Sequence, residues 1–574
     1  MIIKIFRKRE ISIIAILILT AIAINYKMIR DGIIFNAHDI LFHVQWLQHF
    51  SKQLSEGIIY PRWLAGMNYG YGSPTFVFYP PLFFYLGSFL KISGLDTQKA
   101  IIALCTLIFF GAGLSFYLYS RNRWGKAVSC LAAIVYITSP YLFLNIYVRG
   151  ALPETLALVW LPVGLLLTDK AIWQPKWSLL LAILFAILSL THVPSLLVYT
   201  IFWVFYVLSF LLQGHSWKAI ARIIGSALLG FGISSFYLLP TILEKSLVNL
   251  DSQRIVSGGF KANLIGTTVS WASKTMRSEI QPIFIQQSLL IVILAAIIFI
   301  CYRQDSSKIR QTVYWLIFLL VLAFLMTHPS ERLWQYSKIL QMLQFPWRLM
   351  GLFSFGFASI FAIAISGLVS QKLSLKVIAV LTILVTMFGN VSYGYQIAHR
   401  SHSFNNPGDL APNAKLKPQY DPYYRFQDIQ LALKAPYTDR LKDAPEYLPL
   451  LPTGKPAPPP LLSQPAITTV SGEATLDMKQ WGTYRRIFKV SASQQSVIKI
   501  RTYYYPAWHL YINQKLHPST VAPDGTIQIE LEPGSYIVEL RYLWTSAFKL
   551  GVVISICSLS LLILLWFKFP RFLL

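Results

Sequence analysis

Two ionisable side chains stand four residues apart in the segment 36–46. These are Asp39 and His43, and the helical pattern of the segment places both on one side. A carboxylate at a helix start is favoured by the helix dipole, or it acts as a general base or metal ligand that faces a cavity. We therefore take Asp39 and His43 as candidate catalytic residues.

A third candidate, Glu154, follows Pro153 at the border of another apolar segment. Arg149 lies in the short turn just before it. Ionisable groups at the edge of a membrane are functional candidates, although a structural Arg149–Glu154 ion pair explains the same pattern. We predict a catalytic role for Glu154.

Other polar residues fit ligand binding at the same level. Guanidinium groups suit phosphate, whereas the histidine between two apolar segments also suits a hydrogen-bonded structural role, and tyrosines also anchor at membrane interfaces. The predicted substrate-binding residues are His38, Arg62, Tyr79, Arg149, His192, Glu331 and Arg348.

Several nucleotide and protease motifs are absent from the sequence. It contains no phosphate loop, Gly-rich dinucleotide fingerprint, H-E-x-x-H or nucleophile elbow. The four cysteines lie in or beside apolar segments without metal or redox spacing, which indicates small hydrophobic residues. A soluble nucleotide-using active site is therefore unsupported.

The composition indicates the elements that must position these residues. Of 574 residues, 55% are hydrophobic and 13% are charged, and mean hydropathy is +0.53. Soluble domains carry about 25% charged residues, so we predict a polytopic α-helical membrane protein. The net charge of +26 comes from short basic clusters between apolar segments, which favours anionic headgroups rather than nucleic acid as the partner.

Segments near the 20-residue length of a membrane span recur along the chain. We predict an uncleaved first span and twelve spans in all, at about 11–29, 99–119, 127–143, 152–168, 177–192, 195–213, 221–240, 285–302, 312–327, 349–369, 377–392 and 548–567. Some of these are short and closely coupled, so one is a candidate re-entrant segment. All seven basic clusters fall on one side if both termini are cytoplasmic. An extra crossing at 76–92 would invert the later clusters, so we expect an amphipathic surface segment there.

The outer face then carries the long first loop 30–98 and a large segment near the C-terminus. We divide the chain into a transmembrane domain at 1–392, a Pro-rich connection at 393–465, an outer β-sandwich at 466–547, and a last span with a cytoplasmic tail at 548–574. Alternating segments at 496–501, 526–531 and 536–540, separated by Pro- and Gly-containing turns, predict the strands of the sandwich.

This layout resembles the GT-C superfamily of integral-membrane glycosyltransferases, with an acidic residue just after the first span and an outer C-terminal domain. More narrowly, the chain is similar to the bacterial membrane family labelled 6-pyruvoyl-tetrahydropterin synthase-related, although nothing in it looks like a soluble pterin synthase. The β-rich tail with Tyr504-Tyr505-Pro506-Ala507-Trp508 looks like the YfhO-type outer domain. The motifs that carry the family resemblance are Asp39…His43…Gly57, Tyr60-Pro61-Arg62-Trp63, Gly70-Tyr71-Gly72-Ser73-Pro74, Tyr79-Pro80-Pro81-Leu82, Phe345-Pro346-Trp347-Arg348 and Glu446-Tyr447-Leu448-Pro449.

The resemblance implies sugar transfer from a polyprenyl-phosphate donor to a glycan, lipid or protein acceptor of the cell envelope, in the bacterial inner membrane. Asp39 matches the first-loop carboxylate that acts as base or metal ligand. His38 stands where other members have a second carboxylate, so a divalent cation (Mg or Mn) stays open. The alternatives are a lipid-linked glycan transporter or flippase, and an inactive GT-C scaffold that binds glycan or a partner.

Overall fold

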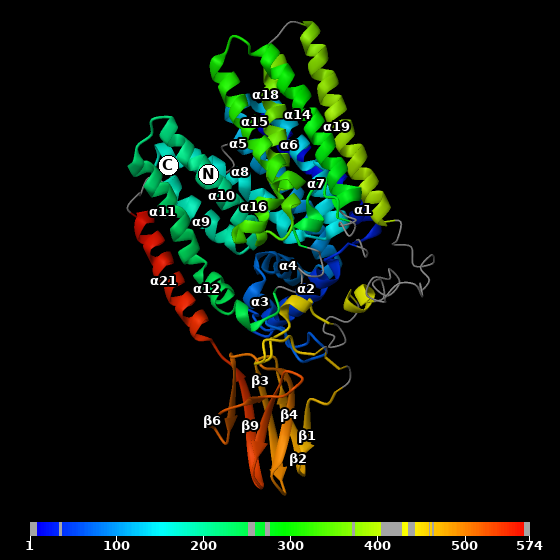
Figure 1. The fold of residues 1–574 in the computed structure, drawn as a ribbon, viewed down its shortest axis with the longest axis vertical. Helices are drawn as coiled ribbons and strands as arrows, with labels where there is room; N and C mark the ends of the chain where they lie inside the picture. The colour runs from blue at the N-terminus through cyan, green and yellow to red at the C-terminus, as the bar shows by residue number, and fades with distance from the viewer. Residues whose placement is uncertain are drawn as a thin grey trace.

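The computed structural model describes residues 8–33, 37–250, 259–269, 276–369, 373–402, 428–433, 442–458, 460–461 and 464–567. Within these ranges, a helical body carries a β domain at one end (Figure 1). About half of the predicted Pro-rich connection lies outside the described residues.

The long apolar helices form the body. They are α1 (Lys8–Asp31), α5 (Thr97–Trp124), α6 (Lys126–Ile137), α7 (Pro140–Phe143) with the π-helix η2 (Leu144–Arg149), α8 (Leu152–Trp173), α9 (Trp177–Ser189), α10 (Val193–Leu212), α11 (Trp217–Ile233), α12 (Ser235–Leu243), the π-helix η5 (Met276–Ile280) with α14 (Gln281–Cys301), α15 (Ser306–Met326), η7 (Pro346–Leu349) with α18 (Met350–Val369), α19 (Leu373–His402) and α21 (Ser546–Phe567).

The prediction of a polytopic membrane protein is confirmed, but the count of twelve spans is corrected. In the described part of the chain, ten helices are long and apolar enough to cross a membrane, or eleven if α11 and α12 form one bent span. Helix α9 has 13 residues, about 20 Å, against a hydrocarbon core of about 30 Å. The predicted span 221–240 is broken at Ser234, where α11 and α12 meet at 75°.

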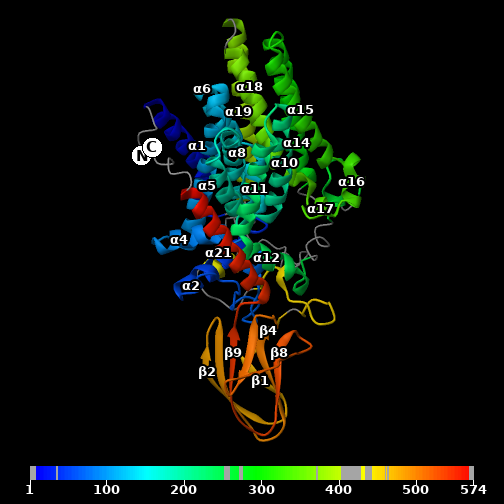
Figure 2. The ribbon, with the colours of Figure 1, turned by 90° about the vertical axis from the view of Figure 1, so that its left-hand side faces the viewer.

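A layer of short helices separates the body from the β domain. Figure 1 shows α2 (Ile40–Ser55), α3 (Thr75–Phe78) and α4 (Leu82–Ile92) there, and Figure 2 shows α2 and α4 in the same place. The segment 76–92, expected at the surface, forms α3 and α4, and the eleven residues of α4 reach only about 17 Å. This layer belongs to the segment 30–98, predicted to be the first outer loop, which carries Asp39 and His43.

Short helical turns complete the connections. They are η3 (Lys245–Leu247), η4 (Lys261–Asn263), η6 (His328–Ser330), α16 (Glu331–Tyr336), α17 (Lys338–Gln341) and η10 (Pro445–Tyr447). The last of these belongs to the segment that precedes the β domain.

The β domain consists of two antiparallel sheets, which confirms the predicted sandwich. The sheet orders are β1-β4-β8-β7 and β2-β3-β9-β5-β6. Inward residues alternate along the strands, so that Ile498 pairs with Ile529 and both are buried. The strands are β1 (Ile467–Ser471), β2 (Ala474–Trp481), β3 (Arg485–Ala492), β4 (Ser496–Tyr503), β5 (Trp508–Ile512), β6 (Lys515–His517), β7 (Thr520–Val521), β8 (Thr526–Leu531) and β9 (Gly534–Tyr542).

Aromatic side chains join this domain to the first outer loop. The buried Trp63 ring lies 5.7 Å from the Trp508 ring and 5.8 Å from the Tyr542 ring. A Cβ at Gly72 would lie 2.4 Å from the Trp63 ring, so only glycine allows the loop to fold over this indole. The loop and the domain therefore share one core.

Candidate functional site

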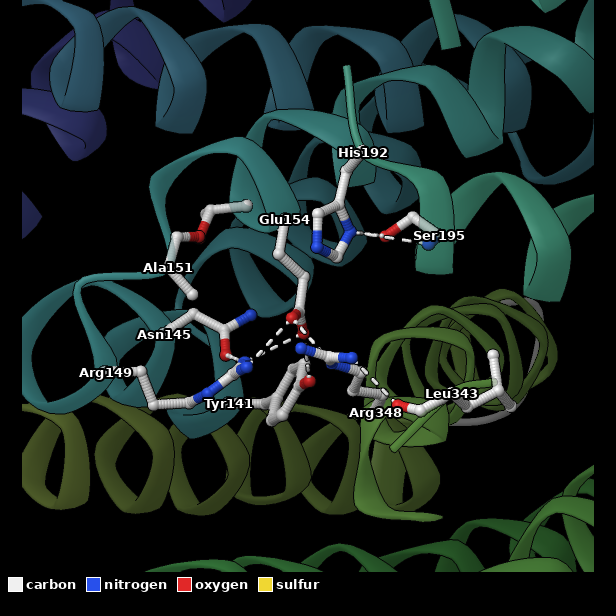
Figure 3. A network of polar contacts seen from close by, with 10 residues as sticks. Tyr141, Asn145, Arg149, Ala151, Glu154, His192, Ser195, Leu343 and Arg348 are labelled. Atoms are coloured by element: carbon white, nitrogen blue, oxygen red, sulfur yellow. Dashed lines mark hydrogen bonds and ion pairs between the residues drawn. The ribbon is translucent and has the colours of Figure 1, made fainter. Parts of the chain in front are cut away.

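A buried ion pair forms the centre of the candidate site (Figure 3). Glu154, in the first turn of α8, accepts hydrogen bonds from Arg149 at 2.8 and 2.9 Å. Arg149 ends η2 and also donates to the Asn145 side chain at 2.6 Å, while the Tyr141 hydroxyl donates to Glu154 at 2.7 Å. This two-bond geometry is the strong form of an arginine–carboxylate contact. The Arg149–Glu154 pair is thus well satisfied by its neighbours.

A second arginine approaches the same carboxylate from η7. Arg348 Nε lies 3.2 Å from Glu154 Oε2, and one terminal nitrogen donates to the Leu343 carbonyl at 2.8 Å. Arg149 donates two hydrogen bonds to Glu154, whereas Arg348 makes one longer contact with it, so Arg348 is the more weakly bound of the two arginines. Two guanidinium groups therefore face one buried carboxylate, and the charge of the nearby Asp39 carboxylate also acts on both of them.

The backbone of the first outer loop docks onto the same turn. The His38 amide donates to the Val148 carbonyl at 2.9 Å, and the Asp39 amide donates to the Arg149 carbonyl at 2.8 Å. Gly150, with φ of 65°, makes this approach possible, since a Cβ there would lie 2.9 Å from the Ile40 nitrogen. Asp39 is therefore held next to Arg149 by main-chain contacts.

The Asp39 carboxylate is exposed and does not cap α2, and in the described part of the chain it makes no hydrogen bond or ion pair. Its charge nevertheless acts on Arg149, Arg348 and His43. An ionised carboxylate near cations and open to solvent is free to accept a proton from a bound hydroxyl. The geometry is thus compatible with the predicted base.

His43 lies beneath Asp39 in an aromatic enclosure. Its ring is buried and lies about 6 Å from those of Tyr79, Phe83 and Phe84, at 6.1, 5.9 and 5.9 Å. Burial lowers the pKa of His43 to about 4, against which the Asp39 charge acts only in part. The imidazole is therefore neutral at neutral pH. Burial also holds the pKa of the Tyr79 hydroxyl well above its usual range.

His192 and Tyr79 complete the group that the fold assembles. His192 caps α10, and its Nδ1 lies 2.8 Å from Ser195 Oγ. Figure 3 shows its ring beside Glu154, and the charge of Glu154 acts on the imidazole. Tyr79 follows α3, and the charges of both Asp39 and Arg348 reach its hydroxyl. Asp39, His43, Tyr79, Arg149, Glu154, His192 and Arg348 therefore gather around one centre.

Two predicted residues lie elsewhere. The guanidinium of Arg62 sits 3.8 Å above the Phe548 ring and 5.2 Å from the Tyr542 ring, at the junction with the β domain. Glu331 pairs with Lys261 at 3.5 Å and lies 3.3 Å from His328. Both side chains are engaged by local partners, and the structure does not bring them into the Glu154 network. His38 is exposed beside Asp39 and contributes a backbone contact.

Residues that the sequence did not single out support the site. The Trp347 ring lies 4.5 Å from the Arg149 guanidinium, and Tyr141 and Asn145 bond the ion pair. Asp443 is buried and accepts bonds from Trp46 Nε1 at 2.7 Å and the Thr75 hydroxyl at 2.5 Å. Burial raises the pKa of Asp443 despite these donors. Trp347 could have been found from the sequence, because it belongs to the motif Phe345-Pro346-Trp347-Arg348. No local pattern indicates the contacts of Asp443.

The donor set for a metal is sparse in the described ranges, where no group of three or more His, Cys, Asp or Glu side chains lies together. Asp39 is the carboxylate that faces solvent next to the network. A divalent cation at Asp39 therefore stays a prediction.

Comparison with known proteins places this site within a family. A family model described as "6-pyruvoyl-tetrahydropterin synthase related domain; membrane protein" matches residues 76–400, more than half of the chain. The chain belongs to this family. The 6-pyruvoyl-tetrahydropterin synthase related region includes Arg149, Glu154 and Arg348 but begins after Asp39, so the first-loop carboxylate lies outside the matched residues.

No curated protein matches the chain. Among solved structures, it is similar to the Archaeoglobus fulgidus oligosaccharyltransferase, crystallised with Zn and sulfate, at 14% identity and a TM-score of 0.32. The match covers 75% of this chain and 53% of that protein, so the chain spans about half of its length.

Proposed function

We propose that this protein is a membrane glycosyltransferase, which moves a sugar from a polyprenyl-phosphate-linked donor to a cell-envelope acceptor on the outer face. One observation carries the proposal. An exposed Asp39 carboxylate is held by backbone bonds beside two arginines that share a single buried carboxylate. The site thus combines a proton acceptor with two guanidinium groups.

The pair of guanidinium groups suits a lipid phosphate as leaving group. A phosphodiester donor carries one negative charge and gains a second as the sugar departs. Arg348, held by one contact to Glu154 and one to a carbonyl, is the cation best placed to bind that developing charge. Arg149 is engaged with Glu154 and serves to hold the site together.

The proposed step is a single displacement at the anomeric carbon. The acceptor oxygen forms the new bond to this carbon while its proton moves to the Asp39 carboxylate. The bond from the same carbon to the phosphate oxygen breaks, and the electron pair leaves with the polyprenyl phosphate. This step inverts the anomeric configuration and needs one base.

The test uses purified full-length protein with a panel of radiolabelled polyprenyl-phosphate sugars and envelope extract. We expect transfer by the natural sequence and a loss of roughly 10²–10⁴-fold for Asp39→Asn. Near-normal transfer by Asp39→Asn would exclude Asp39 as the base. Translocation of the lipid without transfer would favour a transporter.

The two arginines should respond differently. Arg348→Gln should raise the donor KM and leave the folded yield intact, because Arg149 still pairs with Glu154. Arg149→Gln should instead lower the melting temperature, since it leaves the buried carboxylate with only the single Arg348 contact and the Tyr141 hydroxyl, and a broken buried pair costs up to about 3–5 kcal/mol. Equal effects of both changes on the melting temperature would assign Arg348 to the structural pair.

A further inference from the structure

The segment 331–342, which contains α16 and α17, connects a candidate span to the candidate site. It follows α15 and η6, and it leads into Leu343, whose carbonyl accepts a hydrogen bond from Arg348. Figure 2 shows α16 and α17 at the side of the helical body, away from the β domain. The side chains that this α16–α17 segment turns outward therefore meet the surroundings of the helical body.

Internal contacts fix the shape of the α16–α17 segment. Trp334 is buried, stacks on Phe260 with ring centroids 6.0 Å apart, and donates to the Leu325 carbonyl at 2.8 Å. The Gln341 side chain donates to the Trp334 carbonyl at 2.8 Å, which ties the end of α17 to α16. These bonds hold the segment against the last turn of α15, so its outward side chains stay outward.

The outward side of the segment is apolar. Between 50% and 84% of each of its four large apolar side chains is exposed, and these are Leu333, Tyr336, Ile339 and Met342. Leu333 and Tyr336 stand three residues apart in α16, so they lie on one face of that helix. Exposed apolar clusters of this kind mark contacts with a membrane or with another protein.

A neighbouring surface indicates which of the two contacts applies. Helix α15 also has exposed apolar side chains at helical spacing, namely Ile317, Leu320, Val321 and Phe324. Because α15 is a candidate span, this face is one that meets acyl chains. The bond from Trp334 to Leu325 sets α16 beside the last turn of that face, so the apolar surface of the segment adjoins a lipid-facing surface.

The polar side chains of the segment suit anionic headgroups. Arg332 and Lys338 are exposed, whereas Glu331, the only carboxylate of residues 331–342, pairs with Lys261 at 3.5 Å. Long basic side chains beside apolar anchors extend to the phosphates at the bilayer surface. Apolar side chains flanked by cations are typical of segments that lie in the membrane interface.

We propose that the α16–α17 segment inserts into the bilayer leaflet on the side of the β domain. Its four exposed apolar side chains lie among the acyl chains, and its two exposed cations bind the phosphates of anionic phospholipids. This insertion is independent of sugar transfer, and it fixes the stretch of chain that leads to Arg348.

The first test measures depth with the full-length chain in phosphatidylcholine nanodiscs, after its four cysteines are replaced by alanine. A nitroxide is attached to Tyr336→Cys or Ile339→Cys, and its collision rates with oxygen and with a water-soluble nickel complex are measured. Oxygen concentrates among acyl chains, so the ratio of the two rates reports depth. We expect ratios near that of Leu320→Cys on α15 and well above that of Ile537→Cys, an equally exposed apolar position in β9.

Two outcomes of the depth measurement would overturn the proposal. A ratio as low as that of Ile537→Cys would place the segment in water. Low collision rates with both reagents would show that protein covers it, either a partner or a second copy of this chain.

The second test measures the lipid preference with a fluorophore on Ile339→Cys. Spin-labelled phosphatidylglycerol should half-quench it at a lower mole fraction than spin-labelled phosphatidylcholine, roughly fivefold lower for each cation that binds phosphate. Arg332→Gln with Lys338→Gln should remove this preference. Arg303→Gln with Arg310→Gln, at exposed positions by the other end of α15, should keep it. Equal quenching by the two lipids would refute the binding of anionic phospholipids.

Discussion

Replacing Gly150 by alanine should move Asp39 away from the arginine pair. Gly150 has a φ of 65°, and an added Cβ would lie 2.9 Å from the Ile40 nitrogen and 3.4 Å from the Asp39 nitrogen. Both contacts are to backbone, which cannot rotate aside as a long side chain can. The segment that carries Asp39 must therefore shift.

The structure gives the size of the effect. A non-glycine residue in the left-handed region costs about 1–2 kcal/mol. The shift also weakens the amide bonds of His38 and Asp39 to the 148–149 carbonyls, each of which contributes about 1 kcal/mol. We expect a total loss of about 2–4 kcal/mol in unfolding free energy. A displacement near 1 Å of the base should lower the transfer rate about 10²-fold.

Gly57→Ala is the matched control. Gly57 lies in the same loop with a φ of 86°, and no atom lies within 4 Å of an added Cβ. Gly57→Ala should therefore have the cost of the left-handed backbone but no steric clash. Thermal unfolding, sugar transfer and hydrogen exchange of the His38 and Asp39 amides should be measured for both variants. If the two variants show equal hydrogen-exchange rates at the His38 and Asp39 amides and equal rates of sugar transfer, the docking argument is refuted.

Three further predictions concern acidity, topology and packing. Since burial lowers the pKa of His43 from 6.5 to about 4, the unfolded chain binds more protons in that window, and stability should fall by up to about 3 kcal/mol as pH drops through it. His43→Phe should make the fall of the melting temperature between pH 6.5 and 4 shallower; an unchanged slope would contradict this. A cysteine at the exposed Thr520 should react with an impermeant maleimide on intact cells, and one at Lys308 only after lysis; the reverse result would invert the topology. Asp443→Ala should lower the melting temperature more than Asp477→Ala at the exposed β2 position, because buried donors lose their acceptor at about 1–3 kcal/mol each; equal shifts would show that the buried carboxylate adds no stability.

The spans and the sandwich could be predicted because their signals are local. Apolar windows and strand alternation depend on residues close in sequence, as at 496–501, which forms most of β4. The bend at Ser234 was not predicted because the mean hydropathy of a segment does not indicate whether its helix is straight or bent. Helix α9 was overestimated because the predicted span included Leu190, Thr191 and His192, which lie beyond Ser189, where the helix ends.

The candidate site was predictable only in part. Arg149 and Glu154 stand five residues apart around one turn, and Arg348 stood out as a cation on the outer side. The hydrogen bond between Trp46 and Asp443 joins residues that are 397 positions apart. Hydrophobic periodicity depends on neighbouring residues and cannot predict such a contact. Arg62 looked like a phosphate ligand by residue type, but the aromatic rings that face it come from the other end of the chain.

The shared core of the first loop and the β domain has a consequence for biosynthesis. The Tyr484 hydroxyl accepts the amide N–H of Arg62 at 2.7 Å, across 422 residues. Chains grow at about 5–20 residues per second, so the loop waits roughly 20–80 s for this partner. During that interval the Trp63 surface lacks its cover from the C-terminal domain. Nascent chains halted before residue 484 should therefore engage chaperones through the first loop, and their release should coincide with translocation of the β domain.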